Sequence, residues 1–249
     1  MGFLKSTRKR LNRFLNVQFD RGTGFYRYSR YGKNIYIRHP RHFLPESQNS
    51  WLCESIFFKH YLPGNGDVVV DLGAGYGEEA VWLSQHAPAA RYYGMETQPV
   101  IFECLSNTYH GLGKGFCAFP HAIADAKEFK ARSQFSYSSS SQQREGYIYV
   151  PTLTWKAFCE HNKITRIDLL KMNIEGAEKE FINSVHDFSA ISRMVVSCHD
   201  FRANRGDGEH FRTKKIVVEK LRQDGYQIKT FSYGKNWSED WIYAERKGL

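Results

Sequence analysis

The fold class of this chain of 249 residues depends most on residues 68–77, Val-Val-Val-Asp-Leu-Gly-Ala-Gly-Tyr-Gly. The first five of these are mostly apolar and have the length of a buried strand. Glycines then occupy every second position, which allows a tight turn and lets a ligand approach the backbone. A helix that begins behind such a loop offers unpaired N–H groups. The stretch therefore predicts a strand, a ligand-binding loop and a helix.

A predicted helix precedes this strand and loop, and short apolar strands alternate with helices after them. Further strands are expected at 91–96, 116–123, 167–174 and 194–198, followed by an antiparallel pair at 226–231 and 241–245. Helices are expected at 50–62, 77–87, 99–110, 155–161, 177–185 and 213–224. The polar stretch 125–146, which contains four consecutive serines, predicts an exposed loop or a poorly ordered excursion. This order predicts an α/β fold with a doubly wound, mostly parallel seven-stranded sheet.

Positive charge is concentrated at the front of the chain. Residues 1–42 carry 11 basic side chains and one acidic side chain, whereas the other 207 residues carry 24 basic and 25 acidic side chains. Leu4, Leu11 and Leu15 recur among the basic residues at helical spacing, which predicts a basic amphipathic helix. Such a segment could bind an anionic membrane surface, a partner protein or a nucleic-acid backbone, and a solvated terminus is the alternative.

The segment after this basic helix favours a small extension ahead of the main domain. Residues 24–37 alternate aromatic and polar side chains around a central glycine, which predicts a β-hairpin. We therefore expect a basic N-terminal extension over residues 1–49, formed by the helix and the hairpin, and a catalytic domain over residues 50–249.

Composition excludes several classes of protein. No run of apolar residues approaches the roughly 20 that a membrane-spanning helix needs, and the N-terminus lacks the apolar core of a secretory signal. The five cysteines form an odd set without a Cys-x-x-Cys pair, so a disulfide scaffold is not expected. We predict a cytoplasmic protein with reduced thiols, which could associate peripherally with the inner face of a membrane.

Two acids follow neighbouring predicted strands. Asp71 ends the first strand, and Glu96 stands 25 residues later at the end of the next one. A carboxylate beside the glycine loop suits a cationic ligand, and Glu96 is placed to accept hydrogen bonds from two ribose hydroxyls. The alternatives are a helix cap for Asp71 and a solvated loop acid for Glu96.

Residues 71–77 resemble motif I of the class I S-adenosylmethionine-dependent methyltransferases. Together with Val150-Pro-Thr-Leu-Thr154 and residues 167–178, Ile-Asp-Leu-Leu-Lys-Met-Asn-Ile-Glu-Gly-Ala-Glu, they resemble the FkbM-type family within that class, over residues 63–201. The resemblance implies a Rossmann-like fold and S-adenosylmethionine as cofactor. The cofactor-binding residues that we expect are Asp71, Gly73, Ala74, Gly75, Tyr76, Gly77, Glu96, Thr97, Ala122, Ile123 and Asn173.

One residue departs from the family pattern. The family usually has aspartate where this chain has Asn173, at the end of the fourth predicted strand. An amide cannot accept a proton as a carboxylate does, but it can hold cofactor or substrate by hydrogen bonds. We favour the second role for Asn173.

The carboxyl ends of the fourth and fifth strands should bind the methyl acceptor, next to the cofactor. His199 is our first candidate for proton acceptor, with Asp200 or Glu175 orienting its ring, and these three are the expected catalytic residues. In a second hypothesis, Glu175, Glu178 and His199 hold a divalent cation that acidifies the acceptor hydroxyl. The alternative for both glutamates is favourable placement in the first turn of a helix.

These observations predict an S-adenosylmethionine-dependent O-methyltransferase that acts on a sugar hydroxyl of a glycan or glycolipid. A secondary-metabolite hydroxyl is the nearest alternative acceptor, and a catalytically silent cofactor-binding scaffold is the alternative of a different class. A nucleic-acid partner is disfavoured, because the Asp/Asn-Pro-Pro-Tyr/Phe segment of amino-group methyltransferases is absent after the fourth strand. Residues 1–42 could contact a membrane or a glycosyltransferase, and the sequence contains no signal for an oligomeric state.

Overall fold

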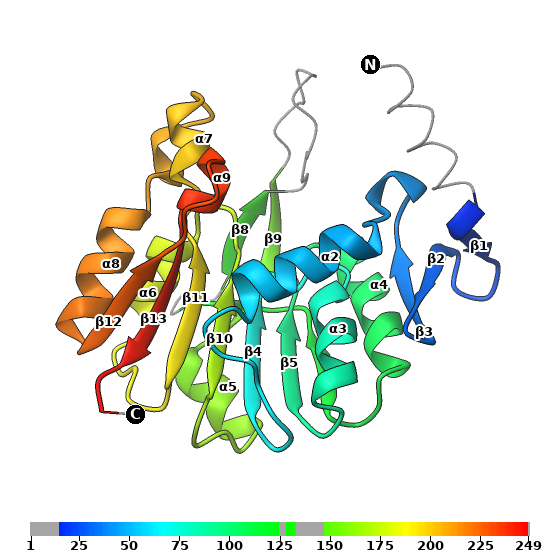
Figure 1. The fold of residues 1–249 in the computed structure, drawn as a ribbon, viewed down its shortest axis with the longest axis horizontal. Helices are drawn as coiled ribbons and strands as arrows, with labels where there is room; N and C mark the ends of the chain where they lie inside the picture. The colour runs from blue at the N-terminus through cyan, green and yellow to red at the C-terminus, as the bar shows by residue number, and fades with distance from the viewer. Residues whose placement is uncertain (1–14, 125–127, 133–146, 249) are drawn as a thin grey trace.

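A computed structural model describes residues 15–124, 128–132 and 147–248 of the protein (Figure 1). The central sheet has seven strands in the order β12-β13-β11-β10-β4-β5-β6. Only β13 runs antiparallel to its neighbours β11 and β12. The predicted fold class and all seven expected strands are confirmed. Their bounds are β4 Val68–Leu72, β5 Arg91–Met95, β6 Phe116–Phe119, β10 Leu169–Met172, β11 Arg193–Ser197, β12 Tyr226–Thr230 and β13 Trp241–Arg246.

The strand order reverses at β4. Leu72 at its end pairs with Met172 of β10 on one side and with Met95 of β5 on the other. The chain passes from β4 to β5 in one direction and later returns to β10 in the other direction. Ligands of doubly wound sheets bind at such a switch point, beyond the carboxyl ends of the strands. The glycine loop follows β4 directly and lies at this position.

Helices cover both faces of the sheet (Figure 1). One face is covered by α2 (Glu46–Leu52), which continues as a π-helical segment η2 (Cys53–Phe57), and by α3 (Glu78–His86) and α4 (Pro99–His110). The other face is covered by α5 (Trp155–His161), α6 (Glu178–Ser184) and α8 (Lys214–Gln223). Side chains of β4 alternate between the two cores, since Val69 belongs to the first and Val68 and Val70 belong to the second.

The N-terminal hairpin is confirmed and belongs to a three-stranded sheet. This sheet consists of β1 (Gln18–Asp20), β2 (Phe25–Arg30) and β3 (Lys33–Ile37), all antiparallel. Tyr31 and Gly32 have φ values of 50° and 72°, as the two-residue hairpin turn requires. A short 3-10 turn η1 (Pro40–His42) leads on to α2. The predicted basic helix lies largely in residues 1–14, outside the described residues.

This N-terminal sheet shares a core with the main domain. Tyr28, Ile35 and Ile37 form a buried cluster with Val81 of α3. The Tyr36 backbone N–H also donates to Thr108 Oγ1 of α4 at 3.0 Å. The expected boundary after residue 49 therefore divides the sequence at a point where the packing is continuous.

The expected loop at 125–146 is wrong for the part of it that the structure describes. β8 (Glu128–Arg132) pairs antiparallel with β9 (Tyr147–Leu153), and β9 also pairs with β7 (Ala122–Ile123). The serine run dominates the composition of the interval and conceals the strand signal at its two ends. In the described ranges, the structure also contains four short helical segments that the sequence did not predict, namely η1, α7 (Asp200–Asn204), η3 (Glu209–Phe211) and α9 (Asn236–Glu239). Among the described residues, none of the helices is long and apolar enough to cross a membrane.

Candidate functional site

The loop after β4 needs its glycines for both conformation and space. Gly73, Gly75 and Gly77 have φ values of 81°, 56° and 85°, in the left-handed region. A Cβ on Gly73 would lie 2.1 Å from the carbonyl oxygen of Asn173, and one on Gly77 would lie 2.7 Å from Tyr109 Cε1. The loop is therefore pressed against the end of β10 and against α4, and it opens α3.

Glu96 lies beside this loop at the end of β5. One of its carboxylate oxygens accepts from the Gly75 N–H at 3.2 Å, and the other accepts from the Gln98 N–H at 2.8 Å. The residue is only 5% exposed, and burial raises the pKa of its carboxyl group to about 7. Backbone groups thus fix a carboxylate at the switch point, where it can accept hydrogen bonds from vicinal hydroxyls.

Asp71 does not fit the expected role of gripping a ligand. Its side chain is fully buried, with Oδ1 2.9 Å from Lys171 Nζ and Oδ2 accepting from the Tyr92 hydroxyl at 2.7 Å. Lys171 also lies 3.5 Å from Glu79 Oε1. Both oxygens are therefore occupied beneath the loop, and Asp71 ties β4 to its neighbours β10 and β5.

The other residues expected to bind cofactor surround the same strand ends. The Tyr76 ring stacks on His42 of η1, and its hydroxyl lies 2.7 Å from His42 Nδ1. Ala74 is buried, and Asn173 is half-buried and donates its N–H to the Leu72 carbonyl at 2.9 Å. Thr97 and Ala122 are also half-buried, and Ile123 is buried in β7. Contacts of these side chains with a cofactor remain predictions.

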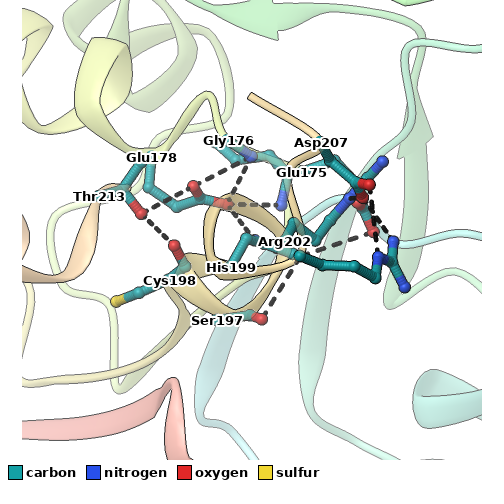
Figure 2. Close-up of polar contacts among 11 residues, drawn as sticks. Glu175, Gly176, Glu178, Ser197, Cys198, His199, Arg202, Asp207 and Thr213 are labelled. Atoms are coloured by element: carbon teal, nitrogen blue, oxygen red, sulfur yellow. Dashed lines mark hydrogen bonds and ion pairs between the residues drawn. The ribbon is translucent and has the colours of Figure 1, made fainter. Parts of the chain in front are cut away.

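At the ends of β10 and β11, His199 lies between two glutamates (Figure 2). Its Nδ1 is 3.0 Å from Glu178 Oε1, and its Nε2 is 3.5 Å from Glu175 Oε1. Burial alone would lower the pKa of the imidazole, but the charge of Glu178 and the hydrogen bonds to both glutamates raise it to about 10. The two glutamates therefore favour the protonated imidazole, and the predicted role of His199 as proton acceptor does not fit this arrangement.

Glu175 remains ionised in the same network. Burial opposes its charge, but hydrogen bonds and charge from His199 and Arg202 lower the pKa of its carboxyl group to about 2. Arg202 continues the network to Asp207, with Nε 2.9 Å from Oδ2 (Figure 2). Glu175 and His199 both have φ values of 56°, a backbone conformation that is strained for residues other than glycine. The ion pairs hold both residues in this conformation.

The predicted metal set comes together in space but not as a set of ligands. Glu178 Oε2 accepts from the Gly176 N–H at 3.1 Å and from Thr213 Oγ1 at 3.2 Å, while Oε1 faces His199. In the described part of the chain, no group of three or more His, Cys, Asp or Glu side chains is arranged to hold a metal ion. The geometry therefore does not support the divalent-cation hypothesis.

Asp200 has a structural role instead of orienting His199. Its Oδ1 accepts from the backbone N–H groups of Thr213 and Lys214, both at 2.9 Å, at the start of α8. A carboxylate at this position stabilises the first turn of a helix. The prediction of Asp200 as a catalytic residue does not fit this geometry.

Arg202 and Asp207, which the sequence pattern does not indicate, complete the network. Both residues belong to the short connection after β11, where no periodic pattern predicts a helix. The Arg202 guanidinium also lies 3.9 Å over the ring of Phe211 in η3, which fixes it above the site. The pairing of an Arg five residues before an Asp was the only available signal, and exposed loops often contain such a pairing.

Comparisons with known proteins identify a family. A sequence model described as the methyltransferase FkbM domain matches residues 71–231. No curated protein sequence matches the chain.

Similar solved structures include a precorrin-6y C5,15-methyltransferase from Geobacter metallireducens GS-15, with 14% identity, a TM-score of 0.44 and coverage of 81% of this chain and 87% of that one. Aeropyrum pernix fibrillarin with bound S-adenosyl-L-methionine has 17% identity, a TM-score of 0.45 and coverages of 90% and 84%. A SAM-dependent O-methyltransferase from Thermotoga maritima has 11% identity, a TM-score of 0.48 and coverages of 82% and 66%.

Proposed function

Because the chain belongs to the FkbM-domain family of methyltransferases, we propose that it transfers the methyl group of S-adenosylmethionine to a sugar hydroxyl of a glycan or glycolipid. The observation that supports the cofactor best is the fixed carboxylate of Glu96 beside a loop of three left-handed glycines. Ribose hydroxyls would donate to Glu96, and the loop would let the nucleoside approach the backbone closely. The sulfonium then supplies an activated methyl group.

In this proposal, the acceptor binds over the ends of β10 and β11. Glu175 is the partly accessible carboxylate of that edge, with 18% of its side chain exposed. It would accept a hydrogen bond from the acceptor hydroxyl and orient the oxygen toward the methyl carbon. The oxygen–carbon bond forms as the carbon–sulfur bond breaks, and the hydroxyl proton leaves to solvent. Alignment of this kind can contribute about 7 to 11 kcal/mol to the rate.

His199 serves this reaction as a positioning residue. Its cation holds Glu175 and Glu178 at fixed distances, and Arg202 holds Glu175 from the other side. Asn173, which replaces the family's usual aspartate, would orient cofactor or acceptor through its amide. Neither residue needs to accept a proton in this scheme, so the loss of the aspartate charge is compatible with methyl transfer.

Methyl transfer can be tested directly with purified protein and labelled S-adenosylmethionine. We expect binding of the cofactor by calorimetry and transfer of label to a saccharide acceptor, with mass spectrometry after acid hydrolysis showing a sugar methyl ether. The variant Glu96→Gln should bind the cofactor about 10- to 100-fold more weakly, because one charged acceptor is lost. Glu103→Gln, at an exposed position of α4, is the matched control, and this variant should bind the cofactor as the wild type does.

Three results would contradict the proposal in different ways. Unchanged affinity in Glu96→Gln would remove Glu96 from the cofactor site. Label found on nitrogen or carbon, or only on a non-sugar hydroxyl of a secondary metabolite, would refute the glycan acceptor while leaving a methyltransferase. Tight cofactor binding without transfer to any acceptor would instead favour the scaffold alternative.

A further inference from the structure

An aromatic cleft opens beside the candidate site and takes no part in the contacts described so far. It has a volume of about 360 Å³. Its lining residues are Ser47, Gln48, Trp51 and Leu52 from α2 and Lys235 and Trp237 from the connection between β12 and β13. In the part of the chain that the structure describes, no acidic side chain lines the cleft, which combines two indole rings with one ammonium group, one hydroxyl and one amide.

The two walls of the cleft belong to elements that flank the reaction centre. On one wall, Asn49 of α2 donates to the carbonyl oxygen of Glu78 at 3.4 Å, at the point where the glycine loop becomes α3. On the other wall, the Asp240 carbonyl that follows α9 accepts from the Cys198 N–H at 3.0 Å, next to His199. The cleft therefore lies between the element that adjoins the cofactor loop and the element that adjoins the acceptor edge.

The geometry of the lining suits a sugar ring. Trp51 and Trp237 have ring centroids 6.0 Å apart and planes at 76°, so they form a corner of two flat apolar surfaces. The Tyr233 ring packs edge-on against Trp51, and its hydroxyl donates to the Ser55 carbonyl at 2.7 Å, which helps to fix this wall. The C–H face of a pyranose carries slight positive charge and packs on the negative face of an indole.

Lys235 adds a positive charge that favours an anionic ligand. Its Nζ lies 4.8 Å from the Trp51 ring centroid and 5.6 Å from that of Trp237. The ammonium group is exposed, and it is held over the rings at the edge of the cleft. A neutral sugar would leave it without an anion, whereas a carboxylate on the ring would pair with it while the ring packs on the indoles.

We propose that this cleft binds a pyranose ring that carries a carboxylate, as a uronic acid does, in the acceptor glycan. The proposal rests on the function proposed above and assigns a substrate class to it. The sugar held in the cleft would not be the methylated unit. It would be a neighbouring unit whose binding places the reacting hydroxyl at the edge formed by β10 and β11.

The test uses the full chain without cofactor, and the probe is a hyaluronan tetrasaccharide. The uncharged control ligand is the same tetrasaccharide after its carboxylates have been reduced to alcohols. Binding is followed by tryptophan fluorescence and saturation-transfer NMR. We expect the acidic probe to bind about tenfold more tightly than the reduced one. Lys235→Gln should remove this difference, and Trp237→Ala should weaken both probes at least tenfold. Lys229→Gln, an exposed lysine on β12, is the matched control and should behave as the wild type does.

The outcomes separate this inference from the proposed function. Equal affinity for the two probes, no binding of the acidic probe at about 10 mM, or unchanged binding in Trp237→Ala overturns the cleft proposal. Binding that depends on Trp237 and Lys235 supports it even where the protein fails to bind S-adenosylmethionine, and that failure would refute only the transferase. Thermal unfolding of each variant, equal to wild type, shows that the changes are local.

Discussion

At the scale of single residues, the most consequential contact is the buried pair of Asp71 and Lys171. Both side chains are 1% exposed. Removing the Asp71 charge would leave the buried Lys171 with Glu79 as its acidic partner, at the longer distance of 3.5 Å. Asp71→Asn should therefore lower the free energy of unfolding by about 3 kcal/mol, measured by urea denaturation.

A double variant provides the control for this effect. Asp71→Leu combined with Lys171→Met removes this ion pair and keeps apolar volume. Burial raises the pKa of Glu79, the other partner of Lys171, so Glu79 can take up a proton and the double variant should be less destabilised than Asp71→Asn. If the double variant is the less stable one, the carboxylate contributes through its hydrogen bond with Tyr92 more than through the ion pair.

His199 predicts a dependence of stability on pH. Its pKa of about 10 in the folded protein lies above the ordinary histidine value of about 6.5, so folding favours the protonated form. Its stabilising contribution is complete below pH 6.5 and is lost as the pH rises toward 10, with a limiting slope of about 1.4 kcal/mol per pH unit. The difference in unfolding free energy between wild type and His199→Gln should shrink between pH 7 and 10. A difference that stays constant over this interval would show that the imidazole is neutral in the folded protein.

Sequence reasoning found the residues of the site more reliably than it found their roles. The spacing of the glycines and the position of Glu96 follow from local pattern, and the structure places them at the ends of the neighbouring strands β4 and β5. The partners of Asp71 and Asp200 depend on tertiary contacts: Lys171 is 100 residues from Asp71, and the backbone groups that Asp200 caps begin 13 residues later. The charge state of His199 likewise depends on burial and on Glu178, which no local pattern contains.

At the scale of elements, the N-terminal sheet should be required for stability. Removing residues 1–14 leaves every described contact in place, so that variant should unfold at nearly the wild-type temperature. Removing residues 1–43 exposes Val81 and deletes Tyr28, Ile35 and Ile37 from their cluster. Each buried side chain contributes about 1.5 to 3 kcal/mol to stability. This truncated protein should therefore unfold at a temperature at least 10 °C lower, or fail to fold. Differential scanning calorimetry of both truncations makes the comparison. Equal melting temperatures would mean that the sheet is a separable domain.

Elements with strong periodicity were predicted closely, and those defined by tertiary contacts were not. The helices at 99–110 and 155–161 match the structure at both ends. Pro99 is the first residue of the first helix, and Thr154 caps the N-terminus of the second. The helix expected at 50–62 instead begins after Pro45 and ends at Phe57. The short α7 and α9 are held by Asp240, whose carboxylate accepts from the Phe201 N–H, and such a contact is invisible in a local pattern.

At the scale of the whole molecule, positive charge is concentrated in the N-terminal segment of residues 1–42, and residues 43–249 are nearly neutral. We propose that residues 1–42 bring the enzyme to an anionic membrane surface, where a glycolipid acceptor would be presented. Five of the 11 basic side chains in this segment lie in residues 1–14, and each basic side chain near such a surface contributes about 1 kcal/mol. Leu15 and Phe19 follow directly and are 68% and 55% exposed, which adds apolar groups for the interface.

Sedimentation with vesicles tests this proposal. The full chain should bind vesicles that contain 30% phosphatidylserine, and removal of residues 1–14 should weaken that binding more than a hundredfold, because about five charge contacts are lost. Raising the salt from 0.05 M to 0.5 M should weaken the full chain similarly, since screening shortens the range of the attraction. Vesicles of phosphatidylcholine alone are the matched control and should bind neither form. Equal binding of the full and truncated chains to the anionic vesicles would show that the basic N-terminal segment has another partner. A glycosyltransferase would then be the first partner to examine.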